Sequence, residues 1–373
     1  MRILLAGGGT AGHVEPALNL ADAVVARFPT AEVVMLGTEH GLEARLAPQR
    51  GYPLELIPAV PLPRRVNRDL AALPLRLRAC VACVRSVMSR RESDVLVGFG
   101  GYVAMPAYLA ARRRVPFVVH EANARAGLAN RVGARFTPYV AQAVDGSLPG
   151  AVTMGIPLRS AIVDCDRQAQ RSAARIAFGL DPVRPVLFVF GGSLGARRIN
   201  EAVLSAVPGL IREGIAVLHA IGSGNGDQFS DDRLIDAGVE VGPCYRPVAY
   251  IDRMDLAYAA ADLALCRAGA VTCAELAAVG LPAVYVPLPI GNGEQRLNAA
   301  PTVSAGGGEF LADSELSGAR VEQTAIRLLR DQAVRERMSA AAASRGIPDG
   351  AERLLNMVVD AVGDRADRGG TRR

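Results

Sequence analysis

The sequence contains no lysine and no tryptophan, so all 42 basic side chains among its 373 residues are arginines. A Walker-type phosphate loop ends in Gly-Lys, and Schiff-base or pyridoxal-phosphate chemistry requires a lysine amine. Those classes of site are therefore excluded. With 50% hydrophobic residues, 21% charged residues and a net charge of +5, the composition is typical of a globular chain long enough for two domains.

Cysteine pairs and membrane-spanning runs are also lacking. The six cysteines are irregularly spaced, and Cys80-x-x-Cys83 stands alone in a helical pattern with no histidine nearby. In a chain of this size we expect reduced thiols rather than disulfides or zinc. Two long uncharged runs, 95–111 and 276–293, contain glycines and prolines that a spanning helix would not hold. These absences predict a soluble protein of a reducing compartment.

Short apolar runs alternate with helical patterns along the whole chain, which predicts parallel sheets joined by crossover helices. The expected strands are 2–6, 32–36, 95–97, 116–120, 185–190, 216–221, 239–242, 262–266 and 283–286. Each half opens with a strand that runs into a glycine-rich turn and then a helix, at 7–13 and at 191–196. This repetition predicts an α/β fold of two Rossmann-like parallel-sheet domains facing a cleft.

Helix-breaking segments place the expected domain boundaries. A Gly-Ile-Pro-Leu-Arg segment separates a first domain, 1–160, from a second domain, 161–345. A Gly-Ile-Pro-Asp-Gly cluster precedes a last helix, 350–363, which we expect to cross back onto the first domain. The charged residues 364–373 are expected to form a disordered tail.

Glycine turns between a strand and a helix expose unpaired N–H groups at the positive end of the helix dipole, a combination that binds phosphate. Two such loops favour a protein with two phosphorylated ligands. Alone, the Gly-x-Gly-x-x-Gly of 7–12 with Glu39 downstream would fit an NAD-dependent oxidoreductase, and either loop would also suit tight helix packing. A third such helix start follows residue 266, where Glu275 is either a ribose ligand or a complement to the dipole.

Six segments together resemble the MurG family of peptidoglycan glycosyltransferases. They follow one another in the family's order over nearly the whole chain and lie at 7–18, 98–103, 120–130, 155–159, 191–197 and 295–299. The resemblance implies the two-domain glycosyltransferase B fold. It also implies an inverting transfer of GlcNAc from UDP-GlcNAc to undecaprenyl-diphosphate-MurNAc-pentapeptide (lipid I), which yields lipid II for peptidoglycan. No cofactor is implied, and the protein would be peripheral on the cytoplasmic side of the cell membrane, with roles in cell shape and division.

The resemblance also implies which residues bind the substrates. In the second domain, Ser193 and the N–H groups of its loop would hold the UDP diphosphate, and Arg159, at the domain boundary, would add positive charge. The uracil would contact Ile251, the ribose would contact Glu275, and the sugar would contact Gln295. Further contacts with UDP-GlcNAc would come from Ala270, Val271 and Thr272, and from the first-domain residues Thr10, Ala11, Gly12 and Asn123, which also line the acceptor pocket. The departures from the family's pattern are Ala11 for Gly, and Ala122 and Glu294 for Gln.

The implied inversion by direct displacement requires a base near the acceptor hydroxyl and stabilisation of the departing UDP. His13 is the first candidate for the base, because a helix N-terminus favours neutral imidazole. Its alternative roles are phosphate binding and helix capping. Glu121, at a strand end, suits either a base or a structural role. The segment Asp164-Cys165-Asp166 matches a metal-binding Asp-x-Asp pattern but leads into a helix, so we expect no metal site.

Arginines interleaved with leucines between 64 and 91 predict a helix with two faces, which Pro74 would start. One face would be a core stripe of Leu73, Leu77, Val81, Val84 and Met88. The adjoining face mixes apolar and basic side chains that would lie on an anionic membrane surface, namely Leu75, Arg78, Ala82 and Arg85, joined by 112–114. A solvated basic face is the alternative. Nucleic acid is not an expected partner, since no aromatic residues alternate with the arginines.

Two other functions remain open at this point. An NAD-dependent oxidoreductase would use only the first glycine loop, and the second loop and the helix that carries Glu275 argue against it. A non-catalytic scaffold that binds sugar nucleotides for cell-wall assembly would have lost its reactive residues. In this sequence His13, Glu121, Asn123 and Gln295 are all present.

Overall fold

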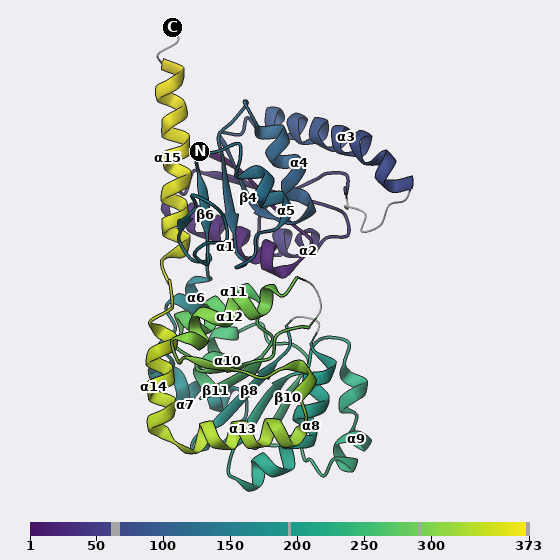
Figure 1. The fold of residues 1–373 in the computed structure, drawn as a ribbon, viewed down its shortest axis with the longest axis vertical. Helices are drawn as coiled ribbons and strands as arrows, with labels where there is room; N and C mark the ends of the chain where they lie inside the picture. The colour runs from purple at the N-terminus through teal and green to yellow at the C-terminus, as the bar shows by residue number, and fades with distance from the viewer. Residues whose placement is uncertain (61–67, 193–194, 290–291, 371–373) are drawn as a thin grey trace. The chain divides into compact units, whose positions relative to one another are not determined.

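The computed structural model describes residues 1–60, 68–192, 195–289 and 292–370. It divides the chain into two compact units, drawn in Figure 1. Unit 1 consists of Met1–Leu158 together with Pro348–Arg373, and unit 2 consists of Arg159–Ile347.

Unit 1 is built on a parallel sheet of seven strands in the order β3-β2-β1-β4-β5-β6-β7. The strands are β1 (Arg2–Gly7), β2 (Glu32–Gly37), β3 (Leu54–Leu56), β4 (Val95–Gly100), β5 (Phe117–Glu121), β6 (Val140–Gln142) and β7 (Val152–Thr153). The helices are α1 (Ala11–Arg27), α2 (Leu42–Gln49), α3 (Arg68–Arg90), α4 (Gly101–Ala111), α5 (Leu128–Gly133) and α15 (Gly350–Gly370). The strand order reverses between β1 and β4, and ligands of doubly wound folds bind at the carboxyl ends of such a pair.

The side chains of β1 alternate between two apolar layers of unit 1. Ile3 and Leu5 pack into a cluster with residues of α1 and α15, and Leu4 and Ala6 pack into another with residues of α3 and α4. All four side chains are at most 2% exposed. Because helices cover both faces of the sheet, its central strands read as continuous apolar runs, which is why the sequence predicts them.

Unit 2 repeats this topology in a parallel sheet of six strands, ordered β10-β9-β8-β11-β12-β13. The strands are β8 (Val186–Phe190), β9 (Ala216–Ala220), β10 (Tyr245–Val248), β11 (Leu263–Cys266), β12 (Ala283–Tyr285) and β13 (Gly308–Phe310). The α-helices are α6 (Ser160–Val163), α7 (Arg167–Ala177), α8 (Arg197–Arg212), α9 (Asp231–Asp236), α10 (Met254–Ala260), α11 (Ala270–Ala278), α12 (Glu294–Ser304), α13 (Gly318–Arg330) and α14 (Gln332–Ala343). Two short 3-10 helices are η1 (Gly226–Phe229) and η2 (Asp313–Glu315).

The strand expected at 239–242 is wrong. The strand that pairs with β9 is β10, which begins at Tyr245. Gly242 makes only an isolated bridge to Tyr245. Pro247 within β10 argues against a strand in the sequence, but β10 is the edge of the sheet, where a missing N–H costs no ladder bond.

Helix α3 begins at Arg68, so Pro74 lies inside the helix and does not start it. The stripe expected to face the core is partly or fully buried: Val84 and Met88 are at most 5% exposed, and Leu73, Leu77 and Val81 pack against the same cluster. The adjoining face, formed by Leu75, Arg78, Ala82 and Arg85, is exposed.

The last helix, α15, continues to Gly370, so a disordered tail starting at 364 is wrong for the residues up to 370. Its apolar face, which includes Leu354 and Val358, packs into the same cluster as α1 (Figure 1). Beyond residue 363 the helix stays attached to unit 1, because the Tyr139 hydroxyl donates to Asp364 and Arg365 donates to the carbonyl oxygen of Asp94 at 3.3 Å. Both contacts join residues far apart in the sequence, so the local composition could not predict that this segment is helical.

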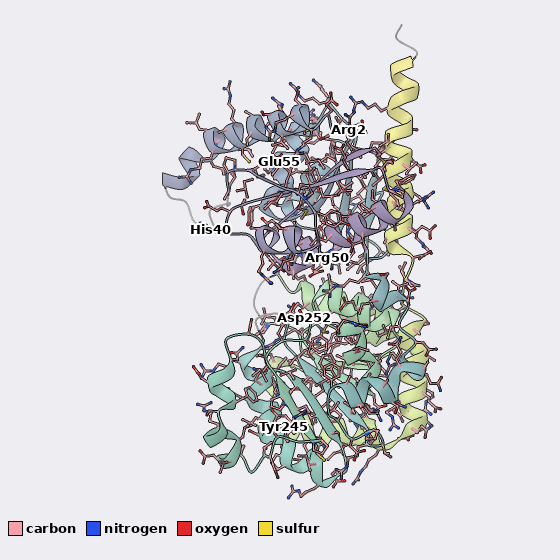
Figure 2. The ribbon with its side chains drawn as sticks, turned by 180° about the vertical axis from the view of Figure 1, so that it is seen from behind. Arg2, His40, Arg50, Glu55, Tyr245 and Asp252 are labelled. Carbon is pink, nitrogen blue, oxygen red and sulfur yellow. The ribbon has the colours of Figure 1, made fainter. Side chains whose placement is uncertain are left out.

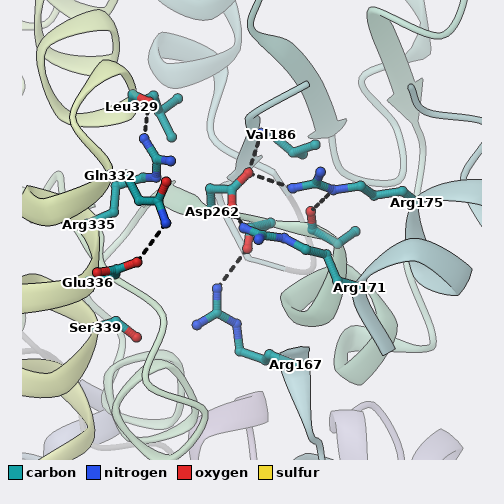
Figure 3. Close-up of polar contacts among 12 residues, drawn as sticks. Arg167, Arg171, Arg175, Val186, Asp262, Leu329, Gln332, Arg335, Glu336 and Ser339 are labelled. Carbon is teal, nitrogen blue, oxygen red and sulfur yellow. Dashed lines mark hydrogen bonds and ion pairs between the residues drawn. The ribbon is translucent and has the colours of Figure 1, made fainter. Parts of the chain in front are cut away.

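Three arginines of α7 make polar contacts with other elements of unit 2, which Figure 3 draws. Arg167 donates to three backbone carbonyls, those of Tyr258, Ala261 and Gly280, at 2.7–3.0 Å. Arg175, whose side chain is 4% exposed, donates to Asp262 at 2.6 Å, and Arg171 also contacts Asp262. Burial lowers the pKa of Arg175 to about 10, and the charge of Arg171 adds to that effect. At neutral pH the guanidinium stays charged and depends on Asp262.

Replacing Asp262 by alanine is expected to destabilise unit 2 strongly. Asp262 is 5% exposed and accepts from Arg175 at 2.6 Å and from the Val186 amide at 2.8 Å. Without it a buried guanidinium loses its counter-charge, which typically costs about 3–5 kcal/mol. Urea denaturation followed by circular dichroism measures the loss.

The matched control is Glu309→Ala, which breaks an exposed pair with Arg327. An exposed pair is worth about 0–1 kcal/mol. Equal losses of unfolding free energy in the two variants would contradict a stabilising role for the buried pair of Asp262 and Arg175.

Candidate active site

The first glycine loop joins β1 to α1. Thr10 is the N-cap of α1, and its carbonyl oxygen accepts from the amides of His13 and Val14, each at 3.1 Å. The amides of Ala11 and Gly12 stand at the start of the helix, where no acceptor is available within the helix. Both residues are half-buried. These two amides are therefore candidate ligand contacts of this loop.

His13 is half-buried, and its ring lies against the turn from β4 to α4. Its Nδ1 is 3.1 Å from Thr10 Oγ1. A Cβ on Gly100 would be 3.1 Å from His13 Nε2, and one on Gly101 would be 3.3 Å from Nδ1. Both glycines have positive φ, +101° and +74°, a backbone that other residues rarely adopt. This turn therefore seats the imidazole directly against the main chain.

Glu121, the last residue of β5, is 2% exposed and accepts hydrogen bonds from four groups of the following segment, one of which is Asn123 Nδ2, 3.4 Å from Oε1. Oε1 accepts from the amide of Asn123 at 2.9 Å. Oε2 accepts from the amide of Gly127 at 3.0 Å and from Asn130 Nδ2 at 2.9 Å. Of the two roles expected for Glu121, these contacts support the structural one, because the carboxylate fixes the loop that carries Asn123.

Tyr108 and Asn130 extend this arrangement. Sequence reasoning missed Tyr108 and placed Asn130 in the family segment 120–130 without a role. The Tyr108 hydroxyl donates to Asn130 Oδ1 at 2.7 Å, and burial raises the Tyr108 pKa. A Cβ on Gly98 or Gly133 would overlap the Tyr108 ring. The signal in the sequence was Gly98, the first glycine of the Gly-Phe-Gly-Gly segment. It leaves room for the ring of Tyr108, which lies in the helix that follows, α4.

The second glycine loop joins β8 to α8. Ser193, expected at the diphosphate, lies outside the described residues. A Cβ on Gly195 would overlap the carbonyl oxygen of Ile221, so the loop packs tightly against the end of β9. Asn200 of α8 donates to the same carbonyl at 2.9 Å and thereby anchors the helix behind the loop.

His219 lies behind this loop as a core histidine, and it is fully buried. Its Nε2 is 3.1 Å from Asn200 Oδ1, and its Nδ1 is 3.1 Å from the hydroxyl of Tyr245, which Figure 2 labels in unit 2. Burial lowers the pKa of His219 to about 3 and raises that of Tyr245. His219 is therefore neutral and joins α8, β9 and β10.

The helix after β11 carries four of the predicted donor residues. Gly269 is the N-cap of α11, and Ala270, Val271 and Thr272 of its first turn are half-buried. Glu275 lies one turn deeper and is 7% exposed. The alternative role for Glu275 was to complement the helix dipole from the first turn. Its buried position one turn deeper does not fit that role.

Glu275 also shapes its surroundings electrostatically. Its Oε2 accepts from the Tyr258 hydroxyl at 2.7 Å. Burial and the Glu275 charge raise the Tyr258 pKa, while the charge of the half-buried Arg159 opposes that rise. Arg159 and Glu275, expected at the diphosphate and the ribose, thus act on one buried hydroxyl.

Gln295 lies in the first turn of α12, and its amide is fixed by two strand ends. Its Oε1 accepts from the amide of Ala268 at 3.2 Å and from the amide of Leu288 at 2.9 Å. Asn298, one turn later, donates to the carbonyl oxygen of Ala268 at 3.3 Å. Both contacts are made by Oε1, so they fix the orientation of the Gln295 side-chain amide. Ile251, expected at the uracil, is 8% exposed between β10 and α10.

Asp313 was also missed. It is 6% exposed at the start of η2 and receives two arginines. Arg267, which ends the β11 segment, donates to Oδ1 at 2.6 Å, and Arg198 of the first turn of α8 is 2.9 Å from Oδ2. One carboxylate thus ties the first turn of α8 and the segment after β11 to the segment after β13.

Two weaker sequence signals have structural explanations. Asp166 of the Asp-x-Asp pattern is the N-cap of α7 and accepts from the amides of Gln168 and Ala169, each at 3.0 Å. Within the described residues there is no group of three or more His, Cys, Asp or Glu side chains that could hold a metal ion. Glu39, the ribose ligand of the oxidoreductase hypothesis, is exposed, as is the next residue, His40, which Figure 2 labels.

Comparison with known proteins identifies the family. A model of the glycosyltransferase family 28 N-terminal domain matches residues 3–142, and one of the family 28 C-terminal domain matches residues 186–354. The crystal structure of Acinetobacter baumannii MurG resembles this fold with a TM-score of 0.76 and 27% identity, covering 96% of this chain and 99% of that one.

Curated relatives from Acidothermus cellulolyticus and Streptomyces coelicolor are 56% and 53% identical over 371 residues each. The alignments cover 98% and 99% of this chain, and 99% and 100% of the relatives. Both relatives are named UDP-N-acetylglucosamine--N-acetylmuramyl-(pentapeptide) pyrophosphoryl-undecaprenol N-acetylglucosamine transferase. The chain belongs to the MurG family.

As a member of the MurG family the chain is a glycosyltransferase with the glycosyltransferase B fold, which confirms the fold class and family expected from the sequence. The oxidoreductase alternative is excluded by this membership. The exposed Glu39 agrees with that exclusion.

The buried His219 makes unit 2 sensitive to acid. Its pKa in the folded state, about 3, lies below the ordinary value of 6.5. The unfolded chain therefore binds the extra proton first, and stability falls as pH drops below 6.5, by up to about 1.4 kcal/mol per pH unit from this group. Urea unfolding at pH 5 and pH 7 should show a smaller difference for His219→Gln than for the native chain. His40→Gln, at an exposed position, should leave the difference unchanged.

Proposed function

We propose that this chain transfers GlcNAc from UDP-GlcNAc to undecaprenyl-diphosphate-MurNAc-pentapeptide, which yields lipid II for peptidoglycan. The observation that carries the proposal is the match, over nearly its full length, to relatives named for this transfer at 53–56% identity. The polar groups described above support it. They gather at the carboxyl ends of the strands in both units, where doubly wound folds bind ligands.

Unit 2 binds the donor in this proposal. Glu275 accepts the ribose hydroxyls, and the oriented NH₂ group of Gln295 donates to the sugar. The first-turn amides of α11 and the guanidinium of Arg159 supply positive charge to the diphosphate. These groups stabilise the charge that grows on UDP as the glycosidic C–O bond breaks.

Unit 1 binds the acceptor, and His13 is the base. Nδ1 of His13 lies 3.1 Å from Thr10 Oγ1, and in the tautomer that carries the proton on Nδ1 the basic nitrogen is Nε2. Nε2 takes the proton of the acceptor hydroxyl as the hydroxyl oxygen attacks the anomeric carbon and UDP departs from the opposite side. One such displacement inverts the α-linked donor to a β-linked product. Glu121 holds the Asn123 loop and takes no part as a base.

Turnover of a lipid I analogue with labelled UDP-GlcNAc tests the function. We expect the native chain to transfer GlcNAc in the presence of EDTA, because amides and Arg159 supply the positive charge. Glu275→Ala should raise KM for UDP-GlcNAc about 10–100-fold, since a hydrogen bond to a charged group is worth about 1.5–3 kcal/mol. The exposed Glu240→Ala is the control. Binding of UDP-GlcNAc without any turnover would instead support the non-catalytic scaffold.

We also propose that α3 places unit 1 on an anionic membrane surface. Leu75 is 72% exposed, and Arg78 and Arg85 are exposed on the same face. Arg112, of the neighbouring triplet, stacks over the ring of the partly exposed Phe136 at 4.1 Å. An apolar side chain among cations is the pattern of an interfacial helix. No helix in the described part of the chain is long and apolar enough to cross a membrane.

Sedimentation with vesicles tests this surface. The double variant Arg78→Ser/Arg85→Ser should bind phosphatidylglycerol vesicles about tenfold more weakly, at roughly 1 kcal/mol for each arginine near the surface. Arg212→Ser/Arg233→Ser removes the same charge from exposed positions of unit 2 and should bind like the native chain. Equal weakening by both pairs would reduce the effect to net charge alone.

A further inference from the structure

A fully buried carboxylate lies beneath the first glycine loop. Glu43 is the second residue of α2, is 0% exposed, and comes from the β2–α2 segment. Its Oε2 accepts from the amide of Gly9 at 3.0 Å. Its Oε1 accepts from the amide of Thr38 at 3.0 Å and from the Thr38 hydroxyl at 3.3 Å. One side chain thus joins the loop after β1 to the loop after β2.

The surrounding backbone leaves room for this carboxylate. A Cβ on Gly37 or Gly41 would overlap the Glu43 side chain, and one on Gly8 would be 2.8 Å from Oε1. Burying a charge is costly unless hydrogen bonds compensate it. Here N–H and O–H donors and the N-terminus of α2 supply that compensation.

A second contact holds the loop from the other side. The Tyr102 hydroxyl is 2.9 Å from Thr38 Oγ1, and a Cβ on Gly9 would be 2.7 Å from Tyr102 Cε1. Gly9 has φ of +89°. Its peptide is therefore confined between the Tyr102 ring and the Glu43 carboxylate.

We propose that Glu43 is the positioning residue of the acceptor loop. Because Glu43 accepts a hydrogen bond from the Gly9 amide, it fixes the orientation of the amides that follow. The amides of Ala11 and Gly12 then face the ligand, whereas the Gly9 amide faces Glu43. The buried negative charge also keeps a bound anion at the start of α1 and away from Gly9. Glu43 touches no substrate and acts through the loop. This inference rests on the proposed function, in which unit 1 binds the lipid-linked acceptor.

Glu43→Gln is the decisive variant, because it keeps the shape but turns one acceptor into a donor that faces an N–H group. Steady-state turnover should show kcat/KM for the lipid I analogue at least tenfold lower. The Kd of UDP, measured by calorimetry, should stay within twofold, since UDP binds unit 2. Hydrogen exchange of the 7–14 segment should become faster. Glu32→Gln, an exposed carboxylate at the start of β2, is the control and should behave like the native chain.

Unchanged kcat/KM in Glu43→Gln would overturn the proposal, as would an equal loss of UDP binding and turnover. If Glu43→Gln does not fold, Thr38→Val removes only the hydroxyl link between Glu43 and Tyr102 and should lower kcat/KM about threefold. Native turnover in that variant would likewise overturn the proposal. If the native chain itself transfers no GlcNAc, the proposed function fails. Exchange of the 7–14 segment in Glu43→Gln still tests the positioning role in that case, and slow exchange would overturn it.

Discussion

The loops at the carboxyl ends of both sheets depend on buried carboxylates that are satisfied by N–H donors. Glu43, Glu121 and Asp313 are each at most 6% exposed. Glu43 and Asp313 each join segments that are distant in sequence, and Glu121 fixes the segment that directly follows it. A carboxylate has about four acceptor positions, so one side chain collects donors from several loops at once. Because leaving such a group without its partners is costly, the loops are held together rather than merely packed.

The two units meet this requirement with different donors. In unit 1 backbone amides serve, as at Gly9 for Glu43 and at Asn123 for Glu121. In unit 2 guanidinium groups serve, since Arg267 and Arg198 both reach Asp313. A chain without lysine gains from this choice, because the planar arginine fork bonds several acceptors at once and stays charged when buried. Some amides of the unit 1 loops are thus used to order the loops themselves.

The sequence was sufficient for the two parallel sheets, because strands covered on both faces are continuous apolar runs. It was also sufficient for the family, whose six segments occur in order. It failed where a distant partner decides the local structure. Pro247 is tolerated because β10 is an edge strand, and Asp364 is helical because Tyr139 holds it. Glu43 has no local signature, since only the fold brings it beneath Gly9.

The glycines of the family segments leave space for neighbouring side chains, so phosphate contacts alone do not explain them. Gly98 leaves space for the Tyr108 ring, and Gly100 leaves space for His13. Gly8 leaves space for Glu43. In each case the missing Cβ belongs to one element and the side chain to another, so a glycine pattern encodes a contact between elements. A single Gly-x-Gly-x-x-Gly therefore does not identify a ligand. Several glycine segments, together with the side chains for which they leave space (Tyr108, His13 and Glu43), specify one site.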